Sequence, residues 1–417
     1  MLRTHKTRPV GGALLLVIAL ALSLCMGALS TTAQAEDPGT PATPGSGADQ
    51  STGGAEPAGP SAPSGLGVAL QDSAAIPDAV NDSFVIKRGL TDSLNVAAND
   101  TCPSAAPDKC QYSLQQIPAG WGANLTGDGV MTIWVPGKTA PGSYSVTYTL
   151  SSGNPVQQDS AQVVVAVTPD NYNPPAGMTF THPYRKGYRT LIRTHVVRTI
   201  NSVPSGARIQ VASWSFASKA YRQALNAAKA RGVVVQIVLA QRNTRKNSDY
   251  QLLARRFSTR VTPDGSWVRR CTYSCRGTSG TMHSKMFLFS QAYRTRYVQM
   301  TGSANLTDFA VTNQWNQMNT VTGNQPVYDE AVRIFTQMYQ DTPARPQYVE
   351  THYSDLWSYY YPRGRASPSN DFMMDALAPV RCTGAVNAGR GGRTIIKIAM
   401  YGNSFRIENH LSVVSSW

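Results

Sequence analysis

The sequence is poor in the residue groupings that build metal and cofactor sites. Its six cysteines and six histidines are scattered through 417 residues, and the cysteines do not cluster with histidines at the spacing of a metal site. Long apolar runs are also missing, because no segment beyond the first 35 residues stays apolar for the about 18 residues that a spanning helix needs. We therefore expect no metal, no cofactor and, apart from the N-terminal segment, a soluble protein.

The first 35 residues have the order of a secretory leader. Three basic residues lie within the first eight positions, residues 11–29 form an apolar core, and the small residues at 33–35 resemble a cleavage site. We expect residues 1–35 to be a signal peptide and the remaining protein to be secreted to the extracellular space. The alternative is an N-terminal membrane anchor.

Five cysteines follow this leader. An exported chain favours disulfides, and the short separations suggest two local pairs. One cysteine then has no partner, which is unusual in a secreted protein. The suggested pairs are Cys102–Cys110 and Cys271–Cys275, and the remaining cysteine is Cys382.

Charge is distributed unevenly along the chain. Residues 36–168 contain 4 basic and 12 acidic residues, whereas residues 169–417 contain 31 basic and 12 acidic residues. Such a basic segment favours an anionic partner: a phosphodiester substrate, an anionic membrane surface or nucleic acid. Most of the basic residues are arginines, whose planar guanidinium suits phosphate. The alternative is that the charge only keeps the protein soluble.

Composition divides residues 36–168 into two parts. Residues 36–75, rich in Pro, Gly and Ser, bury too little apolar surface to offset ordering entropy and predict a flexible linker. Residues 76–168 contain short β-rich runs separated by turn residues, which predict an all-β sandwich. The stretch 80–100 resembles bacterial immunoglobulin-like or cadherin-like modules, which usually act as spacers or adhesion units. The runs are 83–86, 93–96, 131–135, 143–150 and 161–167.

From residue 169 onward the pattern is that of an α/β protein. Apolar residues at helical spacing alternate with continuous apolar runs of the kind found in buried parallel strands. A strand, a helix with Ser218 as its N-cap, and a second strand form a βαβ unit. The helices are expected at 189–201 and 219–231, and the strands at 208–214 and 233–240.

Two short motifs follow this unit. His283-Ser-Lys285 lies in a strand-like run, 281–289, where alternating side chains predict that both residues point to one face. The next strand-like run, 297–301, leads into Gly-Ser-Ala-Asn-Leu-Thr at 302–307. Adjacent strand ends are therefore expected to bring the two motifs together.

The chemistry of a phosphodiester needs this set of side chains. An imidazole can attack phosphorus or donate a proton to the leaving oxygen. A lysine neutralises one non-bridging oxygen, and Ser and Asn donate hydrogen bonds to the others. We expect the catalytic residues to be His283, Lys285, Ser303 and Asn305, with substrate bound by Gly302, Thr307 and Asn316.

The two motifs at this separation resemble those of the phospholipase D superfamily. The resemblance covers roughly 175–417, and the segments 266–277 and 314–316 are similar to its secreted actinobacterial-type members. It implies an α/β/α lobe over 169–380 that hydrolyses phospholipid at the headgroup side through a phosphohistidine. His283 is then the nucleophile or the general acid.

The sequence departs from this family at two positions. The family usually has an Asp a few residues after the Lys, where this chain has Ser290. The family's His usually has an acidic orienting partner, and none can be assigned here, since Asn316 is neutral.

An internal repeat indicates the start of a second lobe. Residues 209–214 match residues 396–401 at an offset of 187, so residues 381–417 are expected to be a connection and the first strand of an incomplete second lobe. A second motif at this offset would fall beyond Trp417. Three hypotheses follow: a poorly active truncated enzyme, a homodimer that pairs two single motifs, or a phosphate-binding domain without turnover.

Two other functions remain open. A secreted nuclease of the same superfamily, working as a homodimer, fits the basic segment equally well. A non-catalytic binding or adhesion protein would use the sandwich as its working part. Surface or packing roles are expected for His182 and His195. Positions in the core or the pocket wall are expected for Trp214, Trp267 and Trp315, with Trp267 also a candidate for a loop.

Overall fold

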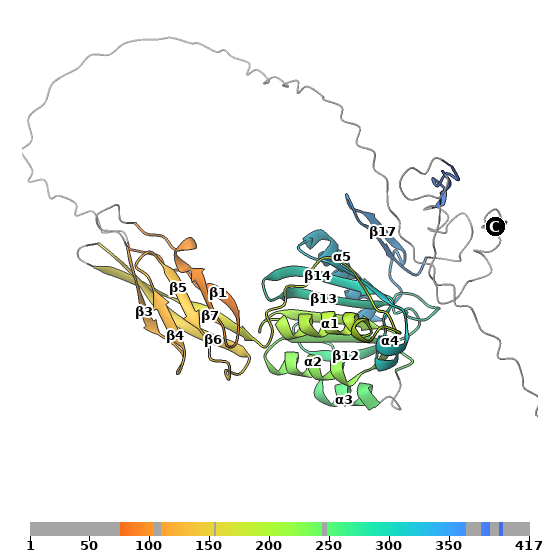
Figure 1. Ribbon diagram of the computed structural model, residues 1–417, viewed down its shortest axis with the longest axis horizontal. Coiled ribbons are helices and arrows are strands. Elements are labelled where there is room, and N and C mark those ends of the chain that lie inside the picture. Colours follow the sequence, from red (N-terminus) through yellow and green to blue (C-terminus); the bar gives the residue numbers. More distant parts are fainter. Residues whose placement is uncertain are drawn as a thin grey trace, which may run out of the picture. The chain divides into compact units, whose positions relative to one another are not determined.

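The protein is described here from a computed structural model (Figure 1). The structure describes residues 76–103, 110–153, 156–243, 248–363, 377–383 and 392–394. The expected leader, linker and strand at 396–401 lie outside these ranges. The chain divides into two compact units, and all helices and strands named below belong to the unit formed by residues 66–364.

The N-terminal part of this unit contains two antiparallel-rich sheets that share one core. Each of the five predicted β-rich runs contains a strand, and apolar residues from both sheets, such as Ile86, Ile133 and Val163, are fully buried together. The immunoglobulin-like or cadherin-like character of this part stays a prediction. One sheet has the order β1 (Asp82–Lys87), β7 (Gln157–Thr168), β6 (Gly142–Ser152) and β3 (Gln111–Gln116). The other has the order β2 (Thr91–Asn95), β5 (Val130–Trp134) and β4 (Gly122–Leu125).

The C-terminal part is built on one mixed sheet of seven strands. Three neighbouring strands at one side are parallel, and the other four continue antiparallel. The order is β12 (Trp267–Cys271), β11 (Val234–Ala240), β9 (Arg208–Ser213), β13 (Lys285–Ala292), β14 (Thr295–Gly302), β16 (Gln317–Val321) and β8 (Gly177–Phe180). The short strands β10 (Phe216–Ala217) and β15 (Leu306–Thr307) pair separately.

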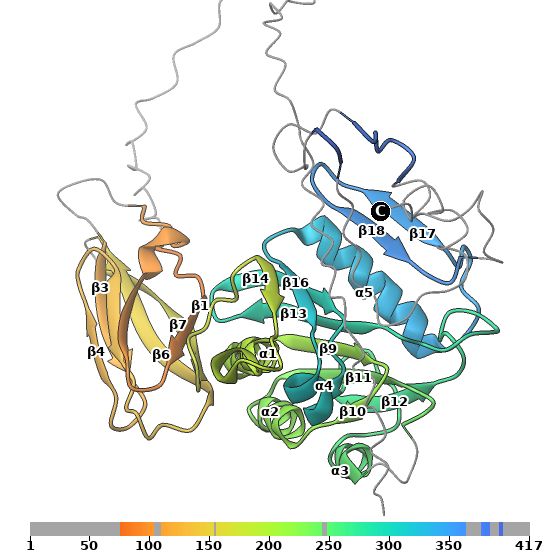
Figure 2. The ribbon, with the colours of Figure 1, turned by 45° about the vertical axis from the view of Figure 1, so that its right-hand side comes forward.

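Helices cover both faces of this sheet, as Figure 2 shows. Alternate residues of β11 separate the two cores: Val235 and Ile237 pack toward one, Val238 and Ala240 toward the other. The prediction of an α/β/α arrangement with a βαβ unit is thus confirmed for this sheet. The first core also receives α1 (Leu191–Ser202), α2 (Lys219–Ala230), α3 (Ser248–Arg256) and α4 (Asp308–Asn313), and the second receives α5 (Gln325–Gln340).

Ser218 stands at the N-cap of α2 as expected, but its side chain does not cap the helix. Its hydroxyl donates a 2.7 Å hydrogen bond to Asp308 instead, so a tertiary contact replaces the local one. At the C-terminal end of α1, the buried guanidinium of Arg231 donates to the carbonyl oxygens of Ile200 and Val203. Carbonyls at the C-terminal end of a helix lack the usual intrahelical donors, so Arg231 satisfies them and joins the end of α1 to the end of α2.

The sequence did not indicate the hairpin that closes the unit. It consists of β17 (Val349–His352) and β18 (Trp357–Tyr360). Buried Arg276 donates 2.6 Å to the carbonyl of Tyr361 and 2.9 Å to the side chain of Gln337, which ties the segment after β12 to the hairpin and to α5. No helix in the described ranges is long and apolar enough to cross a bilayer.

Candidate functional site

Strands from the middle of the large sheet end or begin at one common edge. In the pairing of β13 with β14, Met286 stands opposite Thr301, so Lys285 and Gly302 lie side by side one residue further on. In the pairing of β13 with β9, Lys285 stands opposite Ser213, the last residue of β9. The two predicted motifs therefore meet at the same edge. The residues that follow or precede the strands there are Trp214, Arg242, His283, Ser303 and Asn316.

His283 and Lys285 do not share a strand face, contrary to the sequence expectation. The strand β13 begins only at Lys285, and His283 lies in the preceding loop, where it is exposed. Lys285 is 5% exposed, and its Nζ donates a 2.7 Å hydrogen bond to the carbonyl oxygen of His283. The lysine thus holds the backbone of the histidine while the imidazole faces solvent.

The two residues form a cationic site without a counter-ion. Among the described residues no carboxylate pairs with Lys285 or His283, and burial lowers the pKa of Lys285 from 10.5 to about 8. Partial burial, then the charges of Lys285 and Arg242, lower the pKa of His283 below 6.5. A neutral imidazole beside an unpaired ammonium suits attack on an anionic phosphodiester.

Trp214 joins this pair to a further cation. Its ring lies 4.7 Å from the ring of His283, with the guanidinium of Arg242 4.0 Å from its centroid and Nζ of Lys285 5.3 Å away. Both cations therefore lie against the ring of Trp214. A hollow of about 290 Å³ adjoins them, lined by Gln241, Arg242, Tyr273, Gly280 and Thr281.

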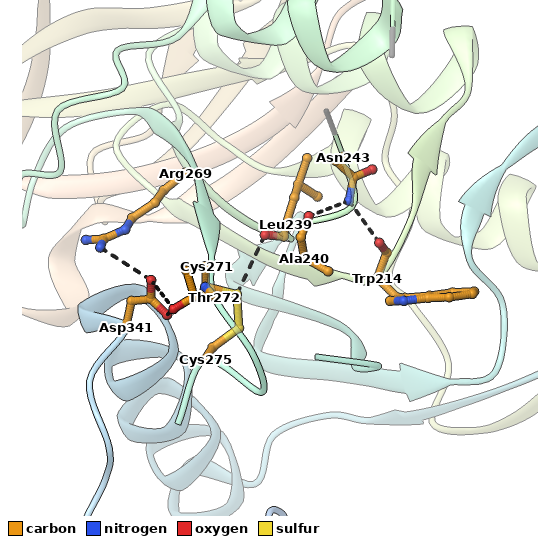
Figure 3. The surroundings of a disulfide bond; sticks show 9 residues. All are labelled: Trp214, Leu239, Ala240, Asn243, Arg269, Cys271, Thr272, Cys275 and Asp341. Atoms are coloured by element: carbon orange, nitrogen blue, oxygen red, sulfur yellow. Dashed lines mark hydrogen bonds and ion pairs between the residues drawn. A yellow bond between two sulfur atoms is a disulfide. The ribbon is translucent and has the colours of Figure 1, made fainter. Parts of the chain in front are cut away.

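The loop that lines this hollow is fixed at both ends. The predicted disulfide between Cys271 and Cys275 is present, and Thr272 donates 2.8 Å from its backbone to Asp341 (Figure 3). The backbone of Met282 donates 2.7 Å to the carbonyl of Tyr273. The disulfide is therefore part of the frame of the site. The other predicted pair, Cys102–Cys110, is also present, and Cys382 is free and exposed.

Gly302 is needed for packing against the neighbouring strand. A Cβ atom at this position would lie 2.2 Å from the carbonyl oxygen of Gln317 and 2.9 Å from Cα of Met318. The Ser303 hydroxyl donates 2.9 Å to Oδ1 of Asn316 and accepts 3.0 Å from the backbone of Gln317. The structure thus places Asn316 behind Ser303, where it orients the hydroxyl.

Asn305 and Thr307 differ in what they offer a substrate. Oδ1 of Asn305 is buried and has no hydrogen-bond partner among the described residues. The Thr307 hydroxyl already accepts 3.1 Å from the backbone of Ala310 and caps α4. Asn305 therefore keeps hydrogen-bonding capacity, whereas the oxygen of Thr307 serves the helix. Their roles toward substrate remain predictions.

Ser290 takes a structural place in this sheet. Its hydroxyl accepts a 2.9 Å hydrogen bond from the backbone of Arg208, at the start of β9. A hydroxyl is sufficient for this contact, so the departure from the family's Asp leaves the edge between His283 and Ser303 unaffected.

Other aromatic residues divide between core and surface. His195 is buried between Tyr172 and Thr320, and burial lowers its pKa to about 4, so it is a neutral packing residue. Trp267 is fully buried in β12, so the expected core role is confirmed and the alternative of a loop position was wrong. Trp315 is 42% exposed beside His182.

Sequence reasoning missed Arg242 as a member of the site. The signal available was its position just after the buried strand β11, at the edge where other strands also end. In the described ranges, no three His, Cys, Asp or Glu side chains gather as metal ligands do.

The fold and the edge site define an α/β lobe that gathers a histidine, a lysine and an arginine at one edge of its sheet. Residues 196–339 match the family model described as "cardiolipin synthase, PLD-like domain". This part of the chain is therefore a phospholipase D-like domain. No curated protein matches the chain.

Three solved structures have some similarity to parts of the chain. The phospholipase D family member Nuc from Salmonella typhimurium is 18% identical, with a TM-score of 0.32 over 40% of this chain and 96% of its own. NucT from Helicobacter pylori is 18% identical, with a TM-score of 0.30 over 39% and 96%. Polyphosphate kinase from Porphyromonas gingivalis is 13% identical, with a TM-score of 0.26 over 49% and 31%.

Proposed function

We propose that this protein is an exported phosphodiesterase that hydrolyses phospholipids at the headgroup side. The observation that carries the proposal is the exposed imidazole of His283, fixed beside the buried and uncompensated ammonium of Lys285. An unpaired buried cation is costly, and a bound phosphate removes that cost. The leader-like pattern of residues 1–35 supports export, and the match to the phospholipase D-like family model supports phosphodiester chemistry.

In the proposed reaction, a ring nitrogen of His283 attacks phosphorus and the bond to the headgroup oxygen breaks. The lowered pKa of His283 keeps its lone pair available at neutral pH. Lys285 neutralises a non-bridging oxygen, and Asn305 donates to another. A water molecule then attacks phosphorus and the phosphorus–nitrogen bond breaks, which releases phosphatidate and the free imidazole. The water gives one proton to the group that protonated the leaving oxygen in the first step.

The leaving headgroup oxygen needs a proton that a single histidine nucleophile does not supply. We infer that a second copy of the chain provides it, with the two His283 residues facing one another across a two-fold axis. Specific activity should then rise with protein concentration. A fully active monomer would contradict the pairing while leaving the assignment of His283 intact.

A second candidate function is hydrolysis of single-stranded nucleic acid. The excess of 31 basic over 12 acidic residues in 169–417 favours it, since phosphate contacts dominate nucleic-acid affinity. Nuclease activity should fall steeply with salt, whereas hydrolysis of neutral phospholipid should depend on salt much less.

One experiment compares wild type, His283→Ala and a matched control, His352→Ala, on phosphatidylcholine vesicles and on single-stranded DNA. His352 is a half-exposed histidine of β17, away from the sheet edge. The proposal predicts turnover of vesicles by wild type and the control, and loss with His283→Ala. Turnover of DNA alone would establish the second candidate, and absence of turnover on both would favour a binding protein.

A further inference from the structure

Large apolar side chains are exposed beside the candidate site. Phe180 at the end of β8 is 56% exposed, and Tyr184 and Tyr188 in the following loop are 80% and 52% exposed. Trp315, which precedes β16, is 42% exposed. Exposed aromatic residues gathered in one place mark an interaction surface.

The same loop carries positive charge without compensation. Arg185, Lys186 and Arg189 are exposed, and none of them pairs with a carboxylate among the described residues. Residues 171–248 contain thirteen Arg and Lys and no Asp or Glu. We call Phe180, Tyr184, Tyr188 and Trp315, together with these three cations, the docking face.

The loop of the docking face has a defined shape. The backbone of Tyr188 donates 2.9 Å to the carbonyl of Arg185, and the backbone of His182 donates 3.3 Å to the carbonyl of Tyr188. His182 packs against Trp315 with ring centroids 4.0 Å apart, and the guanidinium of Arg185 lies 6.0 Å from the Tyr188 ring. A preformed surface loses less entropy on binding than a disordered one.

Hydrogen bonds connect this face directly to the candidate site. The backbone of Thr181 donates 2.9 Å to the carbonyl of Asn316, and the backbone of Asn316 donates 2.9 Å to the Thr181 hydroxyl. Asn316 also accepts from the hydroxyl of Ser303. Whatever the docking face binds is therefore held beside the residues that meet the phosphodiester.

We propose that the docking face binds the surface of an anionic phospholipid bilayer. Its Tyr and Trp side chains have the amphipathic character of interfacial residues, and Phe180 supplies apolar area. The unpaired cations complement anionic headgroups. This proposal rests on the proposed function only in taking phospholipid as the substrate that docking brings to His283.

Single-stranded nucleic acid fits this face less well. Bases bind by stacking on open ring faces. Here the rings of Trp315 and Tyr188 already contact His182 and Arg185. The exposed apolar bodies of these side chains suit insertion among headgroups.

The test measures co-sedimentation of the full chain with phosphatidylcholine vesicles, with and without phosphatidylglycerol. All proteins carry His283→Ala, so that turnover does not alter the vesicles. One variant adds R185Q, K186Q and R189Q, and its control adds R255Q, R256Q and R260Q, which removes the same charge from exposed positions on and after α3. A second pair compares Trp315→Ala with Trp134→Ala, since Trp134 of β5 is 45% exposed.

We expect binding to anionic vesicles to weaken about fivefold for each charge removed from the docking face, and much less in the control. Trp315→Ala should weaken it as well, and Trp134→Ala should not. Equal losses in variant and control would overturn the proposal, and so would binding of single-stranded DNA with no binding of vesicles.

A parallel measurement separates docking from catalysis. With His283 restored, the docking-face charge variant should hydrolyse a monomeric water-soluble phosphodiester as wild type does, and vesicles more slowly. If neither protein hydrolyses any diester but vesicle binding depends on the face, the proposed function fails and the docking proposal stands. If both proteins hydrolyse diesters but the charge variant binds vesicles as well as the control does, the docking proposal fails and the proposed function stands.

Discussion

Replacing Lys285 with Met separates the catalytic and structural consequences of its buried charge. Met has nearly the volume of Lys and keeps the packing of β13, but it removes the ammonium that lies 5.3 Å from the Trp214 ring. A charge-assisted hydrogen bond contributes about 1.5–3 kcal/mol, which corresponds to about 10- to 150-fold in kcat/KM. Phosphodiester hydrolysis should fall by this amount.

The folded state of Lys285→Met should be more stable than that of the wild type, although its activity is lower. The pKa of Lys285 is 10.5 in the unfolded chain and about 8 in the folded protein, so protonated Lys285 disfavours folding at neutral pH. This penalty is complete below pH 8 and disappears as the pH rises toward 10.5. Lys285→Met should therefore raise the thermal midpoint at pH 7 while it lowers activity.

The pH dependence of kcat/KM provides the assay. The wild-type profile should have an acid limb below pH 6.5, where His283 becomes protonated, and an alkaline limb near pH 8, where Lys285 loses its proton. Lys285→Arg should move the alkaline limb upward, since guanidinium stays protonated. Full activity in Lys285→Met, or an alkaline limb unchanged in Lys285→Arg, would refute this reasoning.

Three further substitutions probe the frame of the site. Gly302→Ala should cost about 1–3 kcal/mol of stability because its Cβ meets the Gln317 carbonyl, and a urea titration would show this. Arg242→Ala should lower kcat/KM. It should also move the acid limb of the pH profile upward toward pH 6.5, because one of the charges that lower the pKa of His283 is lost. An acid limb that does not move would show that Arg242 does not act on His283. Arg276→Met should destabilise the protein by about 1–3 kcal/mol in thermal unfolding, since the Tyr361 carbonyl and the Gln337 side chain lose their donor.

The sequence predicted those features that depend on local pattern. The buried run that forms β11 and the amphipathic spacing of α2 are strong signals, because burial on one or both faces dictates their periodicity. The two motifs also lie at one sheet edge, as expected from consecutive strands. The strands β3 and β4 were missed because polar and small residues occupy most of their positions.

Tertiary contacts account for what the sequence did not predict. The alternation of strand side chains predicted that His283 and Lys285 share one face. In the structure β13 begins only at Lys285, where it pairs with β9, so His283 lies outside the strand. Arg242 and Trp214 are distant in sequence from both motifs and meet His283 only through the sheet order. The docking face likewise joins the segment after β8 to the one before β16, where Thr181 and Asn316 bond across 135 residues of sequence.

The most direct test of the central claim is the rate of phosphodiester hydrolysis by His283→Ala relative to wild type and His352→Ala. A positioned histidine contributes about 10²- to 10⁴-fold to such reactions, and a nucleophile at least as much. The account predicts a loss of at least about a hundredfold for His283→Ala and none for His352→Ala. Equal rates in all three proteins would show that His283 is not the catalytic residue.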